Sequence, residues 1–327
     1  MRFIKRIASV IKGSYKAACK TEKENRFRLG IFLDILYCKV RFHASAEEYL
    51  RYRFYDFRDR YRKNFLLLYH QRHEYKKINE TGFTGSKYLF YQRIPDCFFR
   101  EMILAPSCGE ARFVAFAREH RRIVTKPDGG SYGKGIEAYT YTDDDHAREY
   151  FTTLPKNTVC EAFICQHEGV GLLNPNSVNT VRIVSLIYGG EVTIVSATLK
   201  TGGRTDTFAD NMHNDGIGAQ VDIATGVVNT CGFDYNSGRY LKHPVSNVQF
   251  LGLQIPNWNA AVDLVKKAHG QLPQCKLLGW DVAITPTGAD IVEANNAPGT
   301  LLMQIGDMVP KGEKILQVIR EAGKKRH

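Results

Sequence analysis

Apolar and polar positions follow a helical pattern over the first 80 residues of the chain. Between residues 2 and 18 the apolar residues fall on one face, surrounded by lysines and arginines, as in an amphipathic helix. That face comprises Phe3, Ile7, Val10 and Ile11. Over residues 30–80, tyrosines and phenylalanines recur at three- and four-residue spacing. We expect these to form a helical core, since a base-stacking platform is usually a sheet or an OB-fold surface.

From about residue 83, short β-like runs alternate with glycine-rich turns. Strands are expected at residues 121–127, 136–142 and 158–167, and a long hairpin at residues 179–203. Helices are expected at residues 143–154, 262–272 and 313–325. This pattern predicts an α+β fold with mostly antiparallel sheets.

Length and composition are those of a globular protein. The 327 residues can bury a sizeable core, and 43% of them are hydrophobic. No stretch approaches 18 uncharged apolar residues, so no transmembrane helix is indicated. Lys5, Arg6 and Lys12 interrupt the apolar residues of the N-terminus, which is therefore not a signal peptide. The eight cysteines show no zinc-ligand spacing, and we expect reduced thiols in a cytoplasmic protein.

The net charge of +11 is concentrated at one end of the chain. Residues 1–63 contain 17 Lys and Arg against 7 Asp and Glu, whereas the rest is nearly neutral. This distribution argues against a nucleic-acid-binding surface spread over the fold. The basic segment 1–18 fits peripheral contact with the inner face of an anionic membrane, or docking on its own domain with solvated lysines. The sequence leaves both interpretations open.

Two apolar runs near the end of the chain carry acids at matching positions. A Pro-Thr-Gly turn separates them, and a hairpin centred on Thr287 places Asp281 opposite Glu293. Asn295 then lies on the same face as Glu293. Carboxylates this close repel each other unless a cation lies between them, and such oxygen ligands suit Mg²⁺ or Mn²⁺. The alternative is an ordinary hairpin with two exposed acids.

A glycine-rich loop, KPDGGSYGKG, lies between two of the predicted strands. Its glycines allow backbone N–H groups to turn toward a phosphate, and Lys126 and Lys134 add positive charge. Because Gly135 follows Lys134, the loop does not match the Walker pattern, and it does not match the kinase pattern either. A plain hairpin turn is the alternative.

Five segments, in this order, resemble the ATP-grasp superfamily and, more narrowly, its sugar-transfer-associated family. They are KYLFYQ, KPDGGSYGKGI, QHEGVGLLNPNSVNTVRIVSL, FADNMHNDGIGAQVD and LGWDVAITPTGADIVEANNAPG. The resemblance implies an ATP-grasp fold in which two α+β lobes enclose ATP. We therefore expect a basic helical segment over residues 1–82 and a catalytic domain over residues 83–327, with a mobile Gly-loop lobe at about residues 120–165.

The resemblance also implies which residues bind ATP. Lys126 would pair with the α- and β-phosphates, and Lys87 would be a second nucleotide lysine, unless it is a merely exposed cation. The segment EAFI, which begins at Glu161 within the strand expected at residues 158–167, would present backbone groups to adenine, with Phe163 packed beside it. Glu168 would bind the ribose hydroxyls, unless it is only a loop acid. The residues that would close over the triphosphate are Gly129, Gly130, Ser131, Gly133, Lys134 and Gly135.

The other implied site residues face the reacting groups. Arg182, in an otherwise apolar strand, would bind phosphate or a substrate carboxylate, and Lys200 would face the same region. A salt bridge to Asp222 or Asp210 is the alternative for both cations. The Mg²⁺ ligands would be Asp281, Glu293 and Asn295. The substrate-side loop residues would be Asp210, Asn211 and His213.

The resemblance implies an ATP-dependent carboxylate–amine ligase that acts through an acyl phosphate. Its partners would be a small-molecule acid and amine derived from sugars or amino acids, in surface-polysaccharide or glycoconjugate assembly, with no nucleic acid. An ATP-grasp phosphotransferase is the second hypothesis. A basic membrane- or nucleic-acid-binding protein is the third. Both substrates and the oligomeric state stay open.

Overall fold

The computed structural model describes residues 2–21, 28–80, 82, 85–129, 135–204, 212, 215–236 and 238–324. The chain forms two compact units. Unit 1 comprises residues 1–78 and 299–327, and unit 2 comprises residues 79–298. The C-terminal helices therefore belong with the N-terminal segment. Among the described residues, no helix combines the length and the apolar character needed to cross a bilayer.

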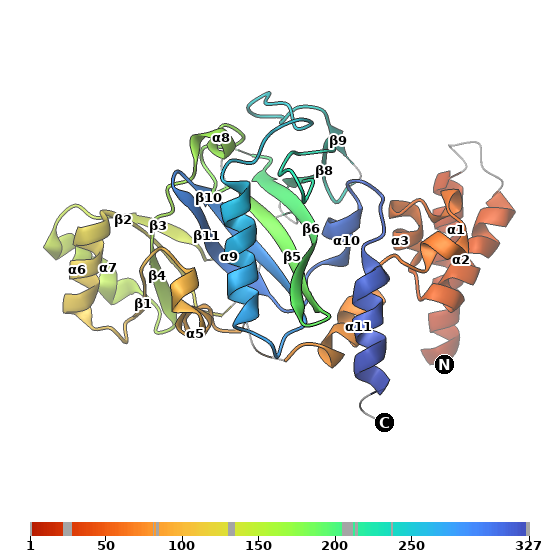
Figure 1. Ribbon diagram of the computed structural model, residues 1–327, viewed down its shortest axis with the longest axis horizontal. Coiled ribbons are helices and arrows are strands. Elements are labelled where there is room, and N and C mark those ends of the chain that lie inside the picture. The colour runs from red at the N-terminus through yellow and green to blue at the C-terminus, as the bar shows by residue number, and fades with distance from the viewer. Residues whose placement is uncertain are drawn as a thin grey trace. The chain divides into compact units, whose positions relative to one another are not determined.

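Unit 1 is helical, as the apolar spacing predicts (Figure 1). Its α-helices are α1 (Arg2–Thr21), α2 (Arg28–Phe42), α3 (Ala46–Arg51), α4 (Asp59–Arg62), α10 (Thr300–Gln304) and α11 (Gly312–Lys324). Shorter helical turns cover Phe54–Asp56, His70–Glu74 and Tyr75–Lys77. A capping box begins α3: the Glu48 N–H donates to the Ser45 side chain, and the Ser45 N–H donates to the Glu48 carboxylate.

Among the α1 side chains that the structure describes, the buried ones are small. Ala17 and Ala18 are buried, whereas Ile11 is 48% exposed. Small side chains allow α1 to lie close against α2 (Figure 1). The predicted apolar face is therefore wrong at Ile11, and the side chains of Phe3 and Ile7 lie outside the described part.

The aromatic residues of unit 1 form its core, as predicted. Tyr49, Tyr52, Phe54 and Phe65 are buried, with relative exposures of 0–1%. The ring centroids of Tyr52 and Phe65 lie 4.9 Å apart, and those of Phe54 and Phe65 lie 5.2 Å apart. Offset and edge contacts of this kind add to the free energy gained from burial alone.

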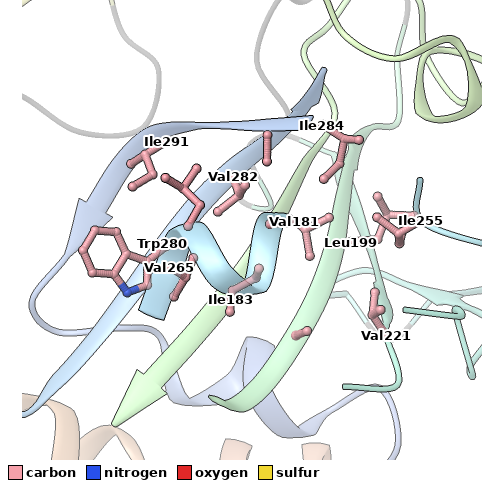
Figure 2. Close-up of a cluster of buried hydrophobic side chains, with 14 of the residues drawn as sticks. Val181, Ile183, Leu199, Val221, Ile255, Val265, Trp280, Val282, Ile284 and Ile291 are labelled. Atoms are coloured by element: carbon pink, nitrogen blue, oxygen red, sulfur yellow. The ribbon is translucent and has the colours of Figure 1, made fainter. Parts of the chain in front are cut away.

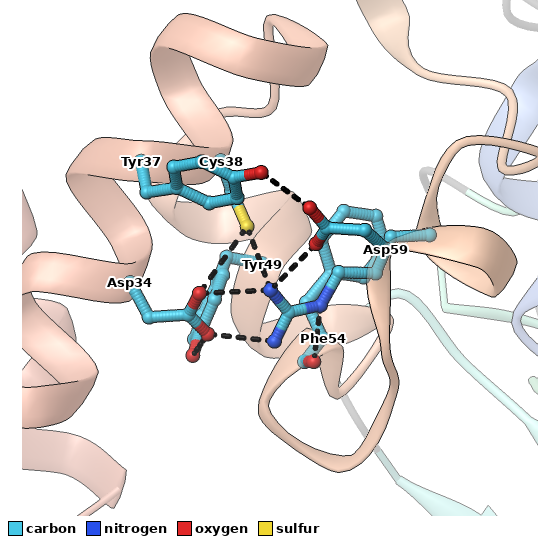
Figure 3. Close-up of polar contacts among 7 residues, drawn as sticks. Asp34, Tyr37, Cys38, Tyr49, Phe54 and Asp59 are labelled. Carbon is cyan, nitrogen blue, oxygen red and sulfur yellow. Dashed lines mark hydrogen bonds and ion pairs between the residues drawn. The ribbon is translucent and has the colours of Figure 1, made fainter.

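A buried arginine joins three of these elements (Figure 3). Arg62 Nη1 and Nη2 donate to the two carboxylate oxygens of Asp34 at 2.8 and 2.7 Å. Arg62 Nε donates to the Phe54 carbonyl at 2.8 Å, and the Tyr49 hydroxyl donates to Asp34 Oδ2 at 2.6 Å. Asp59 accepts a longer bond of 3.4 Å from the same guanidinium. We call these residues, with Cys38, the Arg62 cluster.

Unit 2 contains two antiparallel sheets, the smaller of which has the strand order β1-β4-β2-β3. Its strands are β1 (Met102–Ala105), β2 (Arg122–Pro127), β3 (Glu137–Thr140) and β4 (Thr158–Ala162). Two helices, α6 (Glu110–His120) and α7 (Asp144–Thr153), pack with it around a separate core that includes Phe113, Phe116 and Tyr139. Asp143 begins α7 by accepting a bond from the His146 N–H.

The larger sheet has seven strands in the order β11-β10-β5-β6-β7-β8-β9. They are β5 (Thr180–Tyr188), β6 (Glu191–Gly202), β7 (Gly216–Gln220), β8 (Gly232–Phe233), β9 (Arg239–Tyr240), β10 (Leu277–Thr285) and β11 (Gly288–Asn295). The remaining helices of unit 2 are α5 (Lys87–Arg93), α8 (Glu168–Gly171) and α9 (Trp258–Gly270), with a 3₁₀ turn at Pro95–Cys97. The predicted hairpin around Gly189 and Gly190 is confirmed.

Helix α9 covers one face of the larger sheet (Figure 1). Alternate residues of the strands point toward it, and Val181, Ile183, Trp280 and Val282 are fully buried there (Figure 2). Because successive side chains of a strand face opposite ways, the residues between them lie on the other face. Thr180, Arg182, Lys200 and Asp281 lie on that face, which we call the polar face.

The predicted strand at residues 158–167 is shorter in the structure. It ends at Ala162, whose N–H donates to the Glu101 carbonyl, and the Phe163 N–H donates to the Arg122 carbonyl. The chain then crosses to the larger sheet, where the His167 N–H donates to the Ile284 carbonyl at 2.7 Å. Residues 163–167 therefore connect the two sheets.

Candidate active site

The C-terminal hairpin places two acids opposite each other. Asp281 of β10 pairs with Glu293 of β11, as predicted. The predicted turn centre is wrong, because Thr285 pairs with Gly288 and the turn has two residues. An irregularity between Asp281 and Val282 leaves Val292 as an extra residue in β11. This β-bulge restores the predicted pairing of the two acids.

Two cations from neighbouring strands bind Asp281. Arg182 of β5 lies opposite Asp281 and donates from Nε and Nη2 to its two carboxylate oxygens at 2.6 and 2.8 Å. Lys200 of β6 donates from Nζ to Asp281 Oδ2 at 3.1 Å. The expected alternative partner Asp222 is wrong, since Thr225 donates to that side chain instead. We call Arg182, Lys200, Asp281, Glu293 and Asn295 the Asp281 cluster.

The two carboxylates of the Asp281 cluster are in different electrostatic environments. Burial opposes ionisation of Asp281, but the charges of Arg182 and Lys200 outweigh it and hold its pKa well below the usual value. For Glu293, burial and the charge of Asp281 both raise the pKa. Asn295 Nδ2 donates to Glu293 Oε1 at 3.3 Å. Asp281 is therefore held as an anion, and Glu293 beside it ionises less readily.

The donor set of the Asp281 cluster fits a hard divalent cation. Asp281, Glu293 and Asn295 offer carboxylate and amide oxygens, which Mg²⁺ and Mn²⁺ prefer. The arginine and lysine contacts do not exclude a metal contact, since an ionised carboxylate has about four acceptor sites. A divalent cation here would also reduce the repulsion between the two acids.

A second buried ion pair links β2, which precedes the glycine-rich loop, to β4. The Lys126 ammonium contacts Glu161 Oε1, and both side chains are nearly inaccessible. Burial lowers the pKa of Lys126, and the charges of Arg100 and Lys87 add to that effect, while Glu161 opposes it. The Glu161 side chain thus positions Lys126, in addition to the backbone role that the resemblance implies.

Lys87 lies beside this pair at the start of α5. Asp128, the residue after β2, accepts bonds from Ser86 Oγ at 2.6 Å and from the Tyr88 N–H at 2.8 Å. These bonds hold the first turn of α5, and Lys87 Nζ donates to the Pro127 carbonyl at 3.3 Å. The structure therefore brings Lys87 to the end of the strand that carries Lys126.

The other expected nucleotide residues are less closely grouped. Phe163 lies under the guanidinium of Arg122, 3.9 Å from ring centroid to Cζ. Glu168 is exposed at the start of α8. Gly135 has a positive φ of 73°, which glycine adopts without strain. Gly129 is also described. The residues that lie outside the described part are Gly130, Ser131, Gly133, Lys134, Asp210, Asn211 and His213.

Sequence reasoning missed two charged residues next to the site. Arg100, just before β1, is 6% exposed, and Asp290, in β11, is 3% exposed. Arg100 Nη1 donates to Asp290 Oδ2 at 2.9 Å. A charged residue in the apolar run of a hairpin was a signal for Asp290. No comparable signal marks Arg100.

Comparison with protein families identifies the fold. The model of the sugar-transfer-associated ATP-grasp family matches residues 109–318, which is more than half of the chain. The chain belongs to this family. The ATP-grasp fold predicted from the sequence, with a helical segment before it, is therefore confirmed. Comparison with curated proteins gave no significant match.

Several solved ATP-grasp structures are distantly similar to this ATP-grasp protein. D-alanine–D-alanine ligase from Bacillus anthracis is 13% identical, with a TM-score of 0.43, 75% of this chain covered and 69% of the ligase. Carboxyaminoimidazole ribonucleotide synthase from Aspergillus clavatus, complexed with ATP, is 10% identical, with a TM-score of 0.42 and coverages of 66% and 46%. The ATP-grasp ligase PsnB is 10% identical, with a TM-score of 0.43 and coverages of 73% and 60%. The chain thus spans less than two thirds of the last two.

Proposed function

We propose that this ATP-grasp protein is an ATP-dependent ligase that joins a carboxylic acid to an amine. A carboxylate oxygen of the acid bonds to the γ-phosphorus of ATP, and the bond between that phosphorus and the ADP oxygen breaks. The amine nitrogen then bonds to the acyl carbon, phosphate leaves, and the amine gives up a proton. The products are an amide, ADP and phosphate.

The observation that carries this proposal is the Asp281 cluster on the polar face of the larger sheet. Positioning and charge neutralisation dominate phosphoryl transfer, so the site requires no nucleophilic side chain. In the proposed complex Arg182 and Lys200 bind phosphate oxygens or the acid's carboxylate, and Lys126 and Lys87 bind the α- and β-phosphates. Lys126 and Lys87 reach the same strand end in the structure, which supports their shared role.

Asp281, Glu293 and Asn295 are the proposed ligands of Mg²⁺ or Mn²⁺. Once bound, the metal would neutralise the charge of the β- and γ-phosphates. The glycine-rich loop at residues 129–135 would exclude water from the triphosphate. Phe163 and Glu168 remain the proposed adenine and ribose neighbours, and Asp210 and Asn211 the proposed substrate-side residues.

The proposed substrates are a small acid and a small amine derived from sugars or amino acids, in surface-polysaccharide or glycoconjugate assembly. The family description, sugar-transfer-associated, supports this choice. The test incubates the protein with ATP, Mg²⁺ and panels of acids and amines. We expect ADP release that requires both an acid and an amine. Stable phosphorylation of a hydroxyl acceptor without an amine would instead identify a phosphotransferase.

We also propose that the protein is cytoplasmic and that unit 1 contacts the anionic inner face of the membrane. Leu33 and Val40 lie on one face of α2 and are 55% and 81% exposed, and the exposed Lys12 and Lys16 lie on the adjacent α1. Apolar side chains flanked by lysines suit an anionic lipid surface. Replacing Leu33 and Val40 with Asp should abolish flotation with anionic liposomes, and unchanged flotation would refute the contact.

A further inference from the structure

Arg100 is a buried arginine whose guanidinium reaches both sheets of unit 2. Its Nε donates to Glu161 Oε2, in the smaller sheet, at 3.1 Å. Its Nη1 donates to Asp290 Oδ2 at 2.9 Å and to the Ile291 carbonyl at 2.6 Å, both in the larger sheet. Nη2 donates to the Val292 carbonyl at 3.3 Å. One planar group thus connects strands from the two sheets.

The first set of contacts leads to the phosphate-binding lysine. Glu161 accepts from Arg100 through Oε2 and contacts Lys126 through Oε1. The charges therefore alternate from Asp290 through Arg100 and Glu161 to Lys126. In this buried row each charge depends on its neighbour, since an unpaired buried charge is strongly unfavourable.

The second set of contacts holds the β-bulge of the hairpin. Ile291 faces the core opposite Val282, so strict alternation would turn Glu293 toward the core as well. The extra residue Val292 turns Glu293 to the polar face, opposite Asp281. Arg100 binds the carbonyl oxygens on either side of this change, those of Ile291 and Val292.

We propose that Arg100 is a positioning residue that sets Lys126 and Glu293 together for binding of the metal–nucleotide complex. This inference rests on the proposed ATP-dependent function. Arginine suits the position because its planar guanidinium presents five donors in a fixed geometry. Lysine carries the same charge but cannot bind a carboxylate on one side and two carbonyls on the other in that geometry.

The test measures equilibrium binding of ATP and Mg²⁺ by calorimetry, which does not depend on the unidentified acid and amine. Arg100→Lys should weaken binding of ATP with Mg²⁺ at least tenfold in the folded protein. The matched control is Arg62→Lys, which removes a buried arginine of similar contacts from the Arg62 cluster in unit 1. It should lower stability and leave the affinity of the folded protein within twofold of the original.

Two further variants test the two sets of Arg100 contacts separately. They also replace Arg100→Lys as the test if that variant does not fold. Glu161→Gln should weaken binding of ATP even without Mg²⁺, because Lys126 loses its anion. Asp290→Asn should chiefly raise the Mg²⁺ concentration needed for half-maximal binding, because the bulge beside Glu293 is held less firmly. Wild-type affinity in folded Arg100→Lys, or in both of the other variants, would overturn the positioning role. A wild-type protein that binds no ATP would instead overturn the proposed function and this inference with it.

Discussion

Two arginines, Arg62 in unit 1 and Arg182 in unit 2, each bind both oxygens of one aspartate. In the Arg62 cluster, Asp34 also accepts from the Tyr49 hydroxyl, and the guanidinium also donates to a backbone carbonyl. In the Asp281 cluster, the aspartate also accepts from Lys200 and has a second, partly buried acid, Glu293, directly opposite. The same ion pair therefore occurs in two different surroundings.

The difference between the clusters lies in the neighbours of the aspartate. In the Arg62 cluster the second acid, Asp59, is 46% exposed and is itself bonded to Arg62. Tyr49 and the Phe54 carbonyl are neutral groups that complete the hydrogen bonding, which is what a structural pair needs. Glu293 instead is a second acid whose pKa is raised by burial and by the charge of Asp281. A partly buried acid with a raised pKa beside a cation-bound aspartate is a reason to expect a ligand there, whereas a bidentate pair by itself is not.

The largest expected effect separates the two aspartates. Asp281→Asn should lower ADP formation on the order of 10⁴-fold, about 5 kcal/mol, because a proposed metal ligand is lost. It should also lower the free energy of unfolding by about 3 kcal/mol, since Arg182 and Lys200 lose their anion. Asp34→Asn should lower stability without changing the rate per folded molecule. Urea unfolding and ADP release measure both effects, and near-normal ADP release from Asp281→Asn would contradict the assignment.

Glu293→Gln should separate function from stability. The neutral amide keeps the shape of the side chain and removes repulsion with Asp281, so stability should stay the same or rise by up to about 1 kcal/mol. ADP formation should still fall on the order of 10³-fold, about 4 kcal/mol, through weaker metal binding. A large loss of stability with full activity would show that Glu293 is a structural residue and not a metal ligand.

His269, in α9 over the core face of the larger sheet, provides a buried polar group without charge. Its Nδ1 accepts from Ser185 Oγ at 2.6 Å and its Nε2 donates to the Cys275 carbonyl at 2.9 Å. Burial lowers the pKa of His269 to about 4. The unfolded chain binds a proton near pH 6.5 and the folded protein does not, so stability is lost as the pH falls through that range. Urea unfolding at pH 7.5 and 5 should differ by about 2 kcal/mol from this residue, and His269→Gln should remove that difference. An unchanged pH dependence in the variant would assign the effect to other groups.

The smallest expected effect tests whether the Arg62 cluster is only structural. Tyr49→Phe removes the hydroxyl that donates to Asp34, and stability should fall by about 1 kcal/mol. Thermal unfolding and ATP affinity are the two measurements. A weaker affinity for ATP in this variant would show that the Arg62 cluster is coupled to nucleotide binding.

The hairpin was predictable because its strands and turn are adjacent in the sequence, but the pairing of Asp281 with Glu293 was correct only because the bulge at Val292 offsets the error in the turn centre. The turn centre was wrong because the bulge at Val292 leaves no mark in the alternation of apolar residues. The alternative partner Asp222 for Arg182 was wrong, because the observed partner Asp281 lies 99 residues away in another strand. Helix and strand positions were mostly correct, since they depend on spacing within each segment.

The sequence alone determined the helical N-terminal segment, the antiparallel strands and the hairpin with its two acids, because each follows from residues near one another. The family resemblance supplied the fold, which the family match confirms. Only the tertiary structure decided which buried charges meet: Arg182 with Asp281, Lys126 with Glu161, and Arg100 with Asp290 across 190 residues. These pairs depend on the register of strands distant in sequence, and a shift of one residue turns a side chain to the opposite face.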